Sequence, residues 1–242
     1  MDKTIVYFTD NAMDERLADA CRKWLVKTSC GLPIISVSQR PIDFGENICV
    51  GDMVRCPKSM YYQLLEGLKR VKTKWVQVAE HDCIYSEEHT RWIPPDDKFF
   101  YYNNNVWMMQ YHDPKNPEYD GLFSHRRSRR LQSQIICGTE IYIESVTELL
   151  ELLEVEFWNG RLAEPGTADE VKVLAAATRP SIAHSYDKVK HYLEAYQARD
   201  WKTDIPSIDI RHGRNLTGPR RGSYRNNRLE PWGTMGDILG YE

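Results

Sequence analysis

The sequence predicts an α/β protein built on a mostly parallel sheet that helices flank. Two observations carry this prediction. Apolar runs of strand length alternate with segments whose apolar residues recur at helical spacing, and the alternation begins almost at the first residue. The 242 residues, 41% hydrophobic and 28% charged, are ordinary for a soluble globular protein.

The first elements read as strand, helix and strand. Residues 3–9 are an almost continuous apolar run, as expected for a strand covered on both faces. The polar residues TDN that follow are expected to cap a helix over residues 12–28. Residues 32–38 read as a second buried strand, so we predict a βαβ unit with a right-handed crossover.

The later elements are less regular. A loop over residues 41–52 leads to a helix expected to start at Ser59, and the segment WVQVAEHD then reads as a buried strand that ends in acids. Beyond it the sequence predicts two short strands or one bent strand over residues 98–111, a strand over 133–143, helices over 144–159 and 187–198, and a short strand before residue 211. No repeat or linker marks a boundary, which indicates one domain over residues 1–242.

Composition narrows the classes of protein. No apolar run approaches the roughly 20 residues that a membrane span needs, and the N-terminus lacks the layout of a signal peptide. We therefore expect a cytoplasmic protein without a membrane partner. The six cysteines form no C-x-x-C pair and are expected to be reduced thiols. The formal net charge of −3 does not indicate a polyanion binder.

Acidic residues end one of the predicted strands. Glu80, His81 and Asp82 follow the buried run, and Asp10 follows the first strand. Ligands bind beyond the carboxyl ends of parallel strands, so these residues are expected to share a site. Mg²⁺ or Mn²⁺ prefers oxygen ligands and shares its shell with substrate phosphates, which suits Asp82. His212 is the candidate ligand from elsewhere in the chain; the alternatives are a strand end in solvent and a structural histidine.

Several strings together resemble a known family. TIVYFTDN, LPIISVS, IDFGEN, EHDCIY, YYNNNVW, EPGT and IDIRHGRNLT occur in order between residues 4 and 217. They resemble a bacterial and phage family of GT-A fold glycosyltransferases, which includes phage enzymes encoded beside TET-type dioxygenases that glycosylate 5-hydroxymethylcytosine in DNA. The resemblance implies a UDP-sugar donor, a divalent metal (Mn²⁺ or Mg²⁺), and DNA containing 5-hydroxymethylcytosine as acceptor, in the cytoplasm of an infected cell if the protein is phage-encoded.

The same resemblance implies roles for individual positions. Asp82 and His212 are implied as metal ligands; Asp82 is preferred to Glu80 because a glutamate replaces the first aspartate of the family's DxD motif. The positions implied to bind the nucleotide sugar are Thr9, Asp10, Asn11, Glu80, His81, Arg211 and Asn215. Residues of about 1–110 would form the nucleotide-sugar-binding half, about 111–210 the acceptor-side half, and 211–242 a basic C-terminal segment.

Arginines are concentrated in two segments, SHRRSRR and RHGRNLTGPRRGSYRNNR. Arginine clusters are the usual footprint of a nucleic-acid phosphate backbone, although a charge run can also be a solvated face. The residues predicted to contact DNA are Arg126, Arg127, Arg129, Arg130, Arg214, Arg220, Arg221, Arg225 and Trp107. Tyr224 and Trp232 are expected to stack on a base, which would have to flip out of a duplex into a pocket edged by YYNNNVW.

Sugar transfer also needs a base for the attacking hydroxyl. Glu164, Asp169 and Glu140 are the candidates, and Glu164 is preferred because the Pro-Gly pair after it fixes a tight turn. Open alternatives are a glycan, lipid or small-molecule acceptor, a nucleotidyltransferase, and a non-catalytic DNA-binding module. The turn TDNAMDERLAD contains no glycine, which disfavours the nucleotidyltransferase. The donated sugar, the stereochemistry and the oligomeric state stay open.

Overall fold

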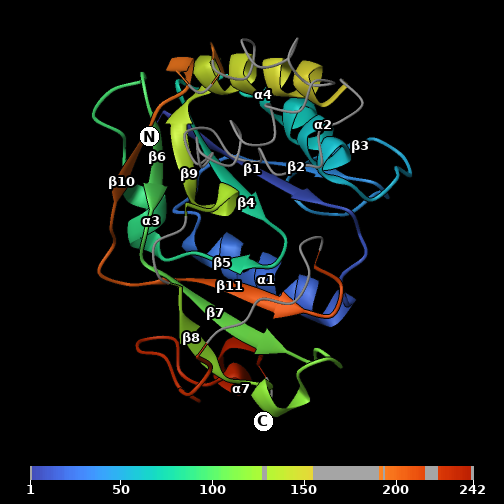
Figure 1. The fold of residues 1–242 in the computed structure, drawn as a ribbon, viewed down its shortest axis with the longest axis vertical. Coiled ribbons are helices and arrows are strands. Elements are labelled where there is room, and N and C mark those ends of the chain that lie inside the picture. Colours follow the sequence, from blue (N-terminus) through green and yellow to red (C-terminus); the bar gives the residue numbers. More distant parts are fainter. Residues whose placement is uncertain (1, 127–129, 155–190, 193, 216–222, 241–242) are drawn as a thin grey trace, which may run out of the picture.

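The computed structural model describes residues 2–126, 130–154, 191–192, 194–215 and 223–240. Their strands form one sheet of seven strands and a second of four. The predicted α/β class, with a mostly parallel sheet flanked by helices, is confirmed (Figure 1). Within the described part of the chain, no helix is long and apolar enough to cross a membrane.

The seven-stranded main sheet has the order β10-β6-β9-β4-β1-β2-β3. Its strands pair in parallel, except that β9 runs antiparallel to both of its neighbours. The strands are β1 (Lys3–Thr9), β2 (Ile34–Ser38), β3 (Glu46–Cys49), β4 (Trp75–Glu80), β6 (Phe100–Asn103), β9 (Ile135–Gly138) and β10 (Ala198–Trp201). Because β1 and β4 are adjacent and parallel, their carboxyl ends meet at one edge.

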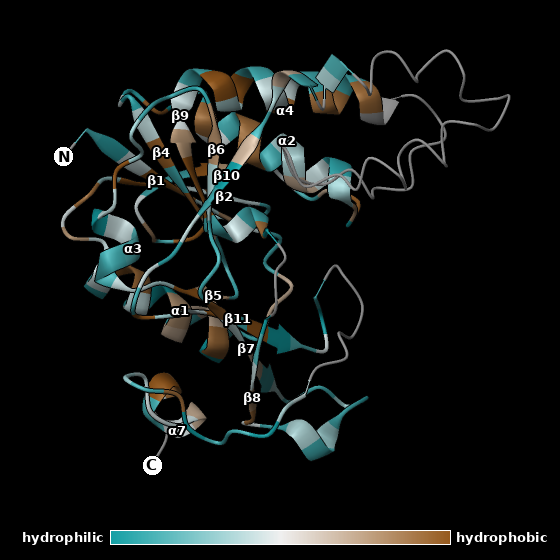
Figure 2. Ribbon diagram, turned by 60° about the vertical axis from the view of Figure 1, so that its left-hand side comes forward, coloured by the Kyte–Doolittle hydropathy of each residue, from teal (hydrophilic) through white to brown (hydrophobic). Residues whose placement is uncertain are grey.

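Helices α2 (Pro57–Leu68) and α4 (Thr139–Glu154) cover one face of the main sheet (Figures 1 and 2). The core between them includes Val6, Val78 and Phe100 from strands, and Leu64 and Tyr142 from the helices. Gly67 lets α2 approach closely, because a Cβ at this position would lie 2.6 Å from the side chain of Val6. The apolar stripe of α2 is therefore packed directly onto β1.

The other face of the main sheet is covered by α1 (Glu15–Thr28), which packs between the two sheets (Figure 2). The second sheet has the order β5-β11-β7-β8, with β5 (Cys83–Ile84), β11 (Ser207–His212), β7 (Val106–Tyr111) and β8 (Phe123–His125). The short helices are α3 (Glu87–Arg91), α7 (Met235–Leu239), and the 3₁₀ turns η1 (Pro117–Tyr119) and η2 (Gln132–Gln134). Trp24 of α1 donates to the carbonyl of Ile238, which fixes α7 onto α1.

Some predicted element ends are wrong. Asp14 caps α1 by accepting from the backbone of Arg16 and Leu17, and the TDN residues form the turn before it. α2 starts at Pro57, so Ser59 lies inside the helix. Residues 133–143 divide among η2, β9 and α4, and β3 lies in the predicted loop. Local chemistry sets the two helix starts, through the Asp14 cap and the proline at the start of α2, whereas pairing with distant strands defines β3 and β9.

Candidate active site

The carboxyl ends of β1 and β4 open into a cavity of about 300 Å³. Most residues implied to bind a nucleotide sugar line it, together with residues that the sequence did not single out. The polar residues of the lining are Thr9, Asp10, Gln39, Arg55, Cys56, Ser59, Gln63, Glu80, His81, Asp82, Gln132, Ser133, Asp209, Arg211 and Asn215. The two strand ends thus meet in the cavity, and His212, which is not part of its lining, lies beside Asp82.

The turn after β1 is held by its own side chains. The hydroxyl of Thr9 accepts from the backbone of Asn11, which adopts a left-handed φ of 53°. The side-chain oxygen of Asn11 accepts from the backbone of Gln39 and Arg40, both at 2.9 Å. Asn11 therefore ties the turn to the end of β2 and does not line the cavity, which leaves Thr9 and Asp10 as the residues presented there.

Asp10 is a carboxylate set among cationic and polar groups. It forms an ion pair with Arg55, accepts from the backbone of Ala12 at 3.0 Å, and lies 3.7 Å from Nδ1 of His81. Burial alone would raise the pKa of Asp10, but His81 and Arg55 outweigh it and lower the pKa below the ordinary value. Asp10 is therefore ionised at neutral pH and can accept hydrogen bonds from a ligand.

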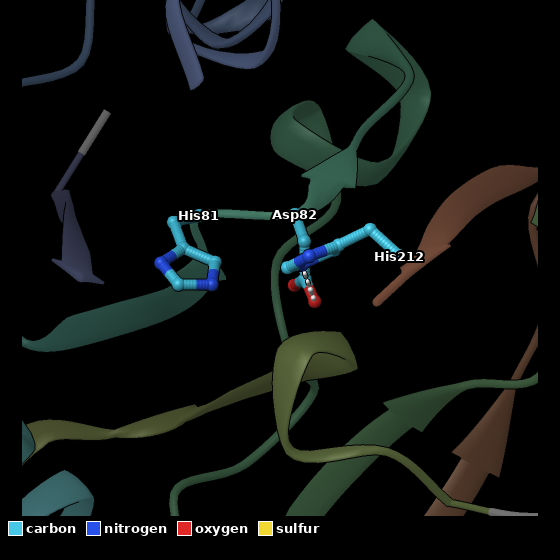
Figure 3. Close-up of side chains that lie close together, drawn as sticks. All are labelled: His81, Asp82 and His212. Atoms are coloured by element: carbon cyan, nitrogen blue, oxygen red, sulfur yellow. Dashed lines mark ion pairs between the residues drawn. The ribbon is translucent and has the colours of Figure 1, made fainter. Parts of the chain in front are cut away.

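His81, Asp82 and His212 form a compact cluster (Figure 3). One possible ligand atom from each residue lies within 4.8 Å of the others. Nε2 of His212 is 3.7 Å from Oδ2 of Asp82, which is ion-pair range but too long for a hydrogen bond. The backbone carbonyl of Asp82 accepts from Ile210 at 2.8 Å, so β11 itself holds the turn after β4 beside His212.

The ring nitrogens fit a cation in different ways. Nδ1 of His81 lies 2.8 Å from the hydroxyl of Thr9 and near Asp10, so we assign the proton to Nδ1 and leave the Nε2 lone pair for an ion. His212 accepts the backbone of Arg214 at Nδ1 over a long 3.3 Å, while its buried Nε2 has no hydrogen-bond partner among the described residues. Ligation through Nε2 requires the proton on Nδ1 and the loss of that weak bond.

The charge states also suit a cation. Burial alone would raise the pKa of Asp82, but His212, His81 and Arg211 outweigh it and hold the pKa well below the ordinary range. Burial lowers the pKa of His81, against the pull of Asp82 and Asp10. The cluster therefore offers an ionised carboxylate and a neutral imidazole, the forms in which these side chains bind metals. Two imidazoles beside one carboxylate favour Mn²⁺ over the harder Mg²⁺.

Asn215 connects the last strand to the acid. Its amide nitrogen donates to Oδ2 of Asp82 at 2.7 Å, and its oxygen accepts from the backbone of His212 at the same distance. Asn215 therefore orients two members of the cluster. Glu80 lines the cavity and makes a second group with Asp82 and Cys83, but burial raises the pKa of Cys83 and keeps its thiol protonated.

The residues predicted to contact DNA differ in how far they are exposed. Arg214 and Arg225 are exposed, whereas Arg130 is half-buried and pairs with Asp200 at 2.6 Å. Trp107 is half-buried, with its ring 5.3 Å from that of His125. Arg126 departs from the prediction of an exposed phosphate contact: it is buried, and pairs with Asp209 at 2.9 Å. Arg127, Arg129, Arg220, Arg221 and the predicted base Glu164 lie outside the described residues.

The aromatic contacts predicted for a base are wrong. Tyr224 is buried and stacks on Tyr119, and Trp232 is buried with its indole nitrogen donating to the carbonyl of Pro206. Both rings complete internal packing. Asn103 and Asn105 are also buried and bond to Thr203, so the YYNNNVW segment does not edge the cavity.

Some residues that line the candidate site have only a weak sequence signal. Arg55 lies in an irregular segment, and it bridges Asp10 to the backbone carbonyl of Arg214, which is distant in sequence. Asp209 and Arg211 alternate with Ile208 and Ile210 along β11, a pattern that places both charges on one face of a strand. That alternation could have identified Asp209, whereas nothing in the local sequence identifies Arg55.

No protein-family model and no curated protein matches the chain. Several solved structures resemble its fold distantly. Glycosyltransferase GlyE of Streptococcus pneumoniae TIGR4 has a TM-score of 0.43 at 10% identity and is aligned over 81% of this chain and 44% of its own. A glycosyltransferase involved in glycosylation of the major capsid of PBCV-1 has a TM-score of 0.43 at 9% identity, over 86% and 91%.

S. aureus TarS 1–349 in complex with UDP-GlcNAc has a TM-score of 0.43 at 10% identity, over 93% of this chain and 60% of that one. The chain thus spans less than half of GlyE and about three fifths of this form of TarS. At such scores and identities these likenesses carry no weight about activity, so the functional assignment rests on the residues of this chain.

Proposed function

We propose that this protein is a metal-dependent glycosyltransferase that moves a sugar from a UDP-sugar to a hydroxyl group of an acceptor. One observation carries the proposal. Asp82, clustered with His81 and His212, lines the same cavity as Asp10 and Arg211. A cavity of about 300 Å³ with convergent polar groups is the ordinary form of a small-molecule site. The motif resemblance described above points to the same activity.

Different residues of the chain would bind different parts of the donor. Thr9 and the ionised Asp10 accept hydrogen bonds from the uridine, and Arg211 binds the diphosphate as a charged donor. Asp82, His81 and His212 would hold the divalent cation. When bound, such a cation neutralises the charge that develops on the departing diphosphate. The hydrogen bonds of Asn215 to Asp82 and to the backbone of His212 would keep both residues oriented toward the cation.

Thermal unfolding with UDP and Mn²⁺ tests the donor half of the proposal. We expect a rise in the melting temperature with both ligands together, because binding only to the native state stabilises it. A nucleotidyltransferase would instead be stabilised by a nucleoside triphosphate and would release pyrophosphate. No shift with UDP and Mn²⁺ would remove the glycosyltransferase proposal.

As acceptor we propose DNA that contains 5-hydroxymethylcytosine, and as location the cytoplasm, of the infected cell if the protein is phage-encoded. Support comes from the family resemblance and from Arg214, which is exposed next to the cluster. Incubation of such DNA with a panel of UDP-sugars, followed by mass spectrometry of its nucleosides, is expected to show on the modified cytosine a mass increase equal to one sugar residue of the donor that is used. Transfer to a glycan, lipid or small molecule instead would remove the DNA acceptor and leave the transferase.

Exposed arginines give a second test of the acceptor. Arg225→Ala is expected to weaken DNA binding and to lower the salt dependence of the affinity by about one charge. Fluorescence anisotropy over a range of salt concentrations measures both. An unchanged salt slope would mean that the Arg225 side chain does not contact DNA phosphates.

Glu164 remains our proposal for the catalytic base. Glu164→Gln is expected to lower turnover by about 10²–10⁴-fold while the affinity for UDP stays the same. Residues of about 1–110 would serve the donor, about 111–210 the acceptor, and 211–242 would form a basic segment. This division would describe function and not separate structural units, because the main sheet takes strands from both sides of residue 110.

A further inference from the structure

Three buried charged side chains connect the second sheet to the wall of the cavity. Asp209 and Arg211 lie two residues apart on β11, so they share one face of the strand, and both line the cavity. Arg126 follows β8 and reaches Asp209 from the far side of β7. The side chains of all three are only 7% exposed, which makes each charge costly unless it is matched.

The two oxygens of Asp209 are divided between the two arginines. Oδ2 accepts from Nη1 of Arg126 at 2.9 Å, and Oδ1 lies 3.5 Å from Nη1 of Arg211. Burial and the nearby Asp82 raise the pKa of Asp209, whereas Arg211 lowers it. A carboxylate buried to this degree stays ionised only with strong cationic partners, and Arg126 makes the shorter contact.

The Asp209 carboxylate has two cationic neighbours, and one of them, Arg211, also lies in the electrostatic field of Asp82. Arg211 is the cation that lines the cavity, and Arg126 is not part of the lining. Arg126 therefore neutralises part of the charge of Asp209 without lining the cavity, so that Arg211 need not be the sole counter-ion of Asp209. Without Arg126, the Asp209 carboxylate would compete with any anionic ligand for the Arg211 guanidinium.

We propose that Arg126 is a positioning residue for Arg211, acting through Asp209 to keep the Arg211 guanidinium available to the anionic diphosphate of the donor. This role rests on the proposed function, because the ligand is the donor of that reaction. It also gives Arg126 a role within the protein in place of the DNA contact that the sequence suggests.

Calorimetric titration with UDP and with uridine, both with Mn²⁺, tests the role. Arg126→Gln is expected to weaken UDP binding about tenfold, the typical effect of one hydrogen bond to a charged group. Uridine lacks the diphosphate, so its affinity is expected to stay within about twofold of the wild type by the same reasoning. An equal loss for both ligands would show general damage to the cavity and would overturn the proposal.

A rescue variant separates positioning from direct contact. Adding Asp209→Asn to Arg126→Gln removes the competing anion and retains a side-chain oxygen for Arg211. UDP affinity is expected to return to within about threefold of the wild type, because neutral partners of similar shape can replace a buried ion pair. A double variant as weak as Arg126→Gln alone would contradict the proposal.

The Asp209→Asn background also serves if Arg126→Gln alone does not fold. In the Asp209→Asn background, Arg126→Gln is expected to change UDP affinity by less than about twofold, because Arg126 acts through the Asp209 carboxylate that this background lacks. A tenfold loss in that background would mean that Arg126 acts on the ligand by another route. Arg22→Gln is the matched control: Arg22 is 14% exposed and pairs with Glu15 on α1, outside the cavity lining. Failure of the wild type to bind UDP would count against the proposed function itself.

Discussion

The two ends of strands β1 and β4 bury charge in different ways. At the amino end Lys3 is fully buried, and its ammonium group donates to the backbone carbonyls of Thr90 and, at 2.7 Å, Trp92. At the carboxyl end Asp10 and Asp82 face other side chains and a cavity. The first arrangement caps the end of α3 through backbone carbonyls. In the second arrangement the charged groups line the cavity.

A buried histidine near each strand end shows the same contrast between the two ends. Both His89, near Lys3, and His212 have a buried Nε2 without a hydrogen-bond partner among the described residues. His89 lies between the rings of Tyr85 and Trp201, and burial with the nearby Lys3 lowers its pKa to about 3. His212 instead faces the Asp82 carboxylate. An orphaned nitrogen therefore indicates a cation site only where an acid stands beside it.

The largest effect is expected from Asp82→Asn. The change removes the one carboxylate of the cluster, and with it several kcal/mol of charge stabilisation, so sugar transfer should fall about a thousandfold or more. Steady-state turnover of a UDP-sugar measures it. Asp97→Asn, an exposed acid paired with Lys74 at the opposite end of β4, is the control and should leave turnover unchanged. Equal activity of the two variants would abolish the distinction between the ends.

A smaller effect is expected on metal affinity. His212→Gln should weaken Mn²⁺ binding by at least about 10–100-fold, the range seen when even outer-shell partners of a metal are lost. Titration of Mn²⁺ in the presence of UDP gives the affinity. His89→Gln is the matched variant, because His89 is a buried histidine with an orphaned nitrogen that faces no carboxylate at ion-pair distance among the described residues. This variant should bind Mn²⁺ as the wild type does. A similar loss in both would point to global destabilisation.

The smallest effect concerns stability at the amino end. Burial lowers the pKa of Lys3 to about 7, whereas an unfolded lysine titrates near 10.4. Between these values the unfolded chain binds more protons, so the free energy of unfolding contributed by Lys3 rises with pH. Relative to Lys3→Met, the wild type should gain roughly 1 kcal/mol per pH unit above about pH 7. Urea unfolding of both proteins at several pH values gives the difference, and a flat difference would refute the shifted pKa.

The sequence predicts the site residues at the ends of β1 and β4 better than it predicts His212, which comes from a distant strand. Thr9 and Asp10 with Glu80–Asp82 were expected to converge because they end buried runs, and the adjacent parallel pairing of β1 and β4 brings them together. The pairing of Asp82 with His212 is implied by the family resemblance and not by any local pattern that joins them, and the antiparallel pairing of β5 with β11 is what places them 3.7 Å apart.

The second sheet and its charges were harder to predict. Arg126 lies in a run of arginines, and local composition indicates an exposed basic patch. Its burial depends on Asp209, which is 83 positions further along the chain. Trp232 likewise is buried because Trp24 and Pro206 surround it. Contacts between distant segments decide such cases, and a single sequence does not display them.

The central claim is that Asp82 holds a cation that binds the diphosphate of a nucleotide sugar. Calorimetric titration of UDP with and without Mn²⁺, on the wild type and on Asp82→Asn, tests it most directly. We expect UDP to bind the wild type tightly only when Mn²⁺ is present, and Asp82→Asn to bind UDP weakly in both conditions. Equal UDP affinity in all four titrations, or none in the wild type with Mn²⁺, would contradict the claim.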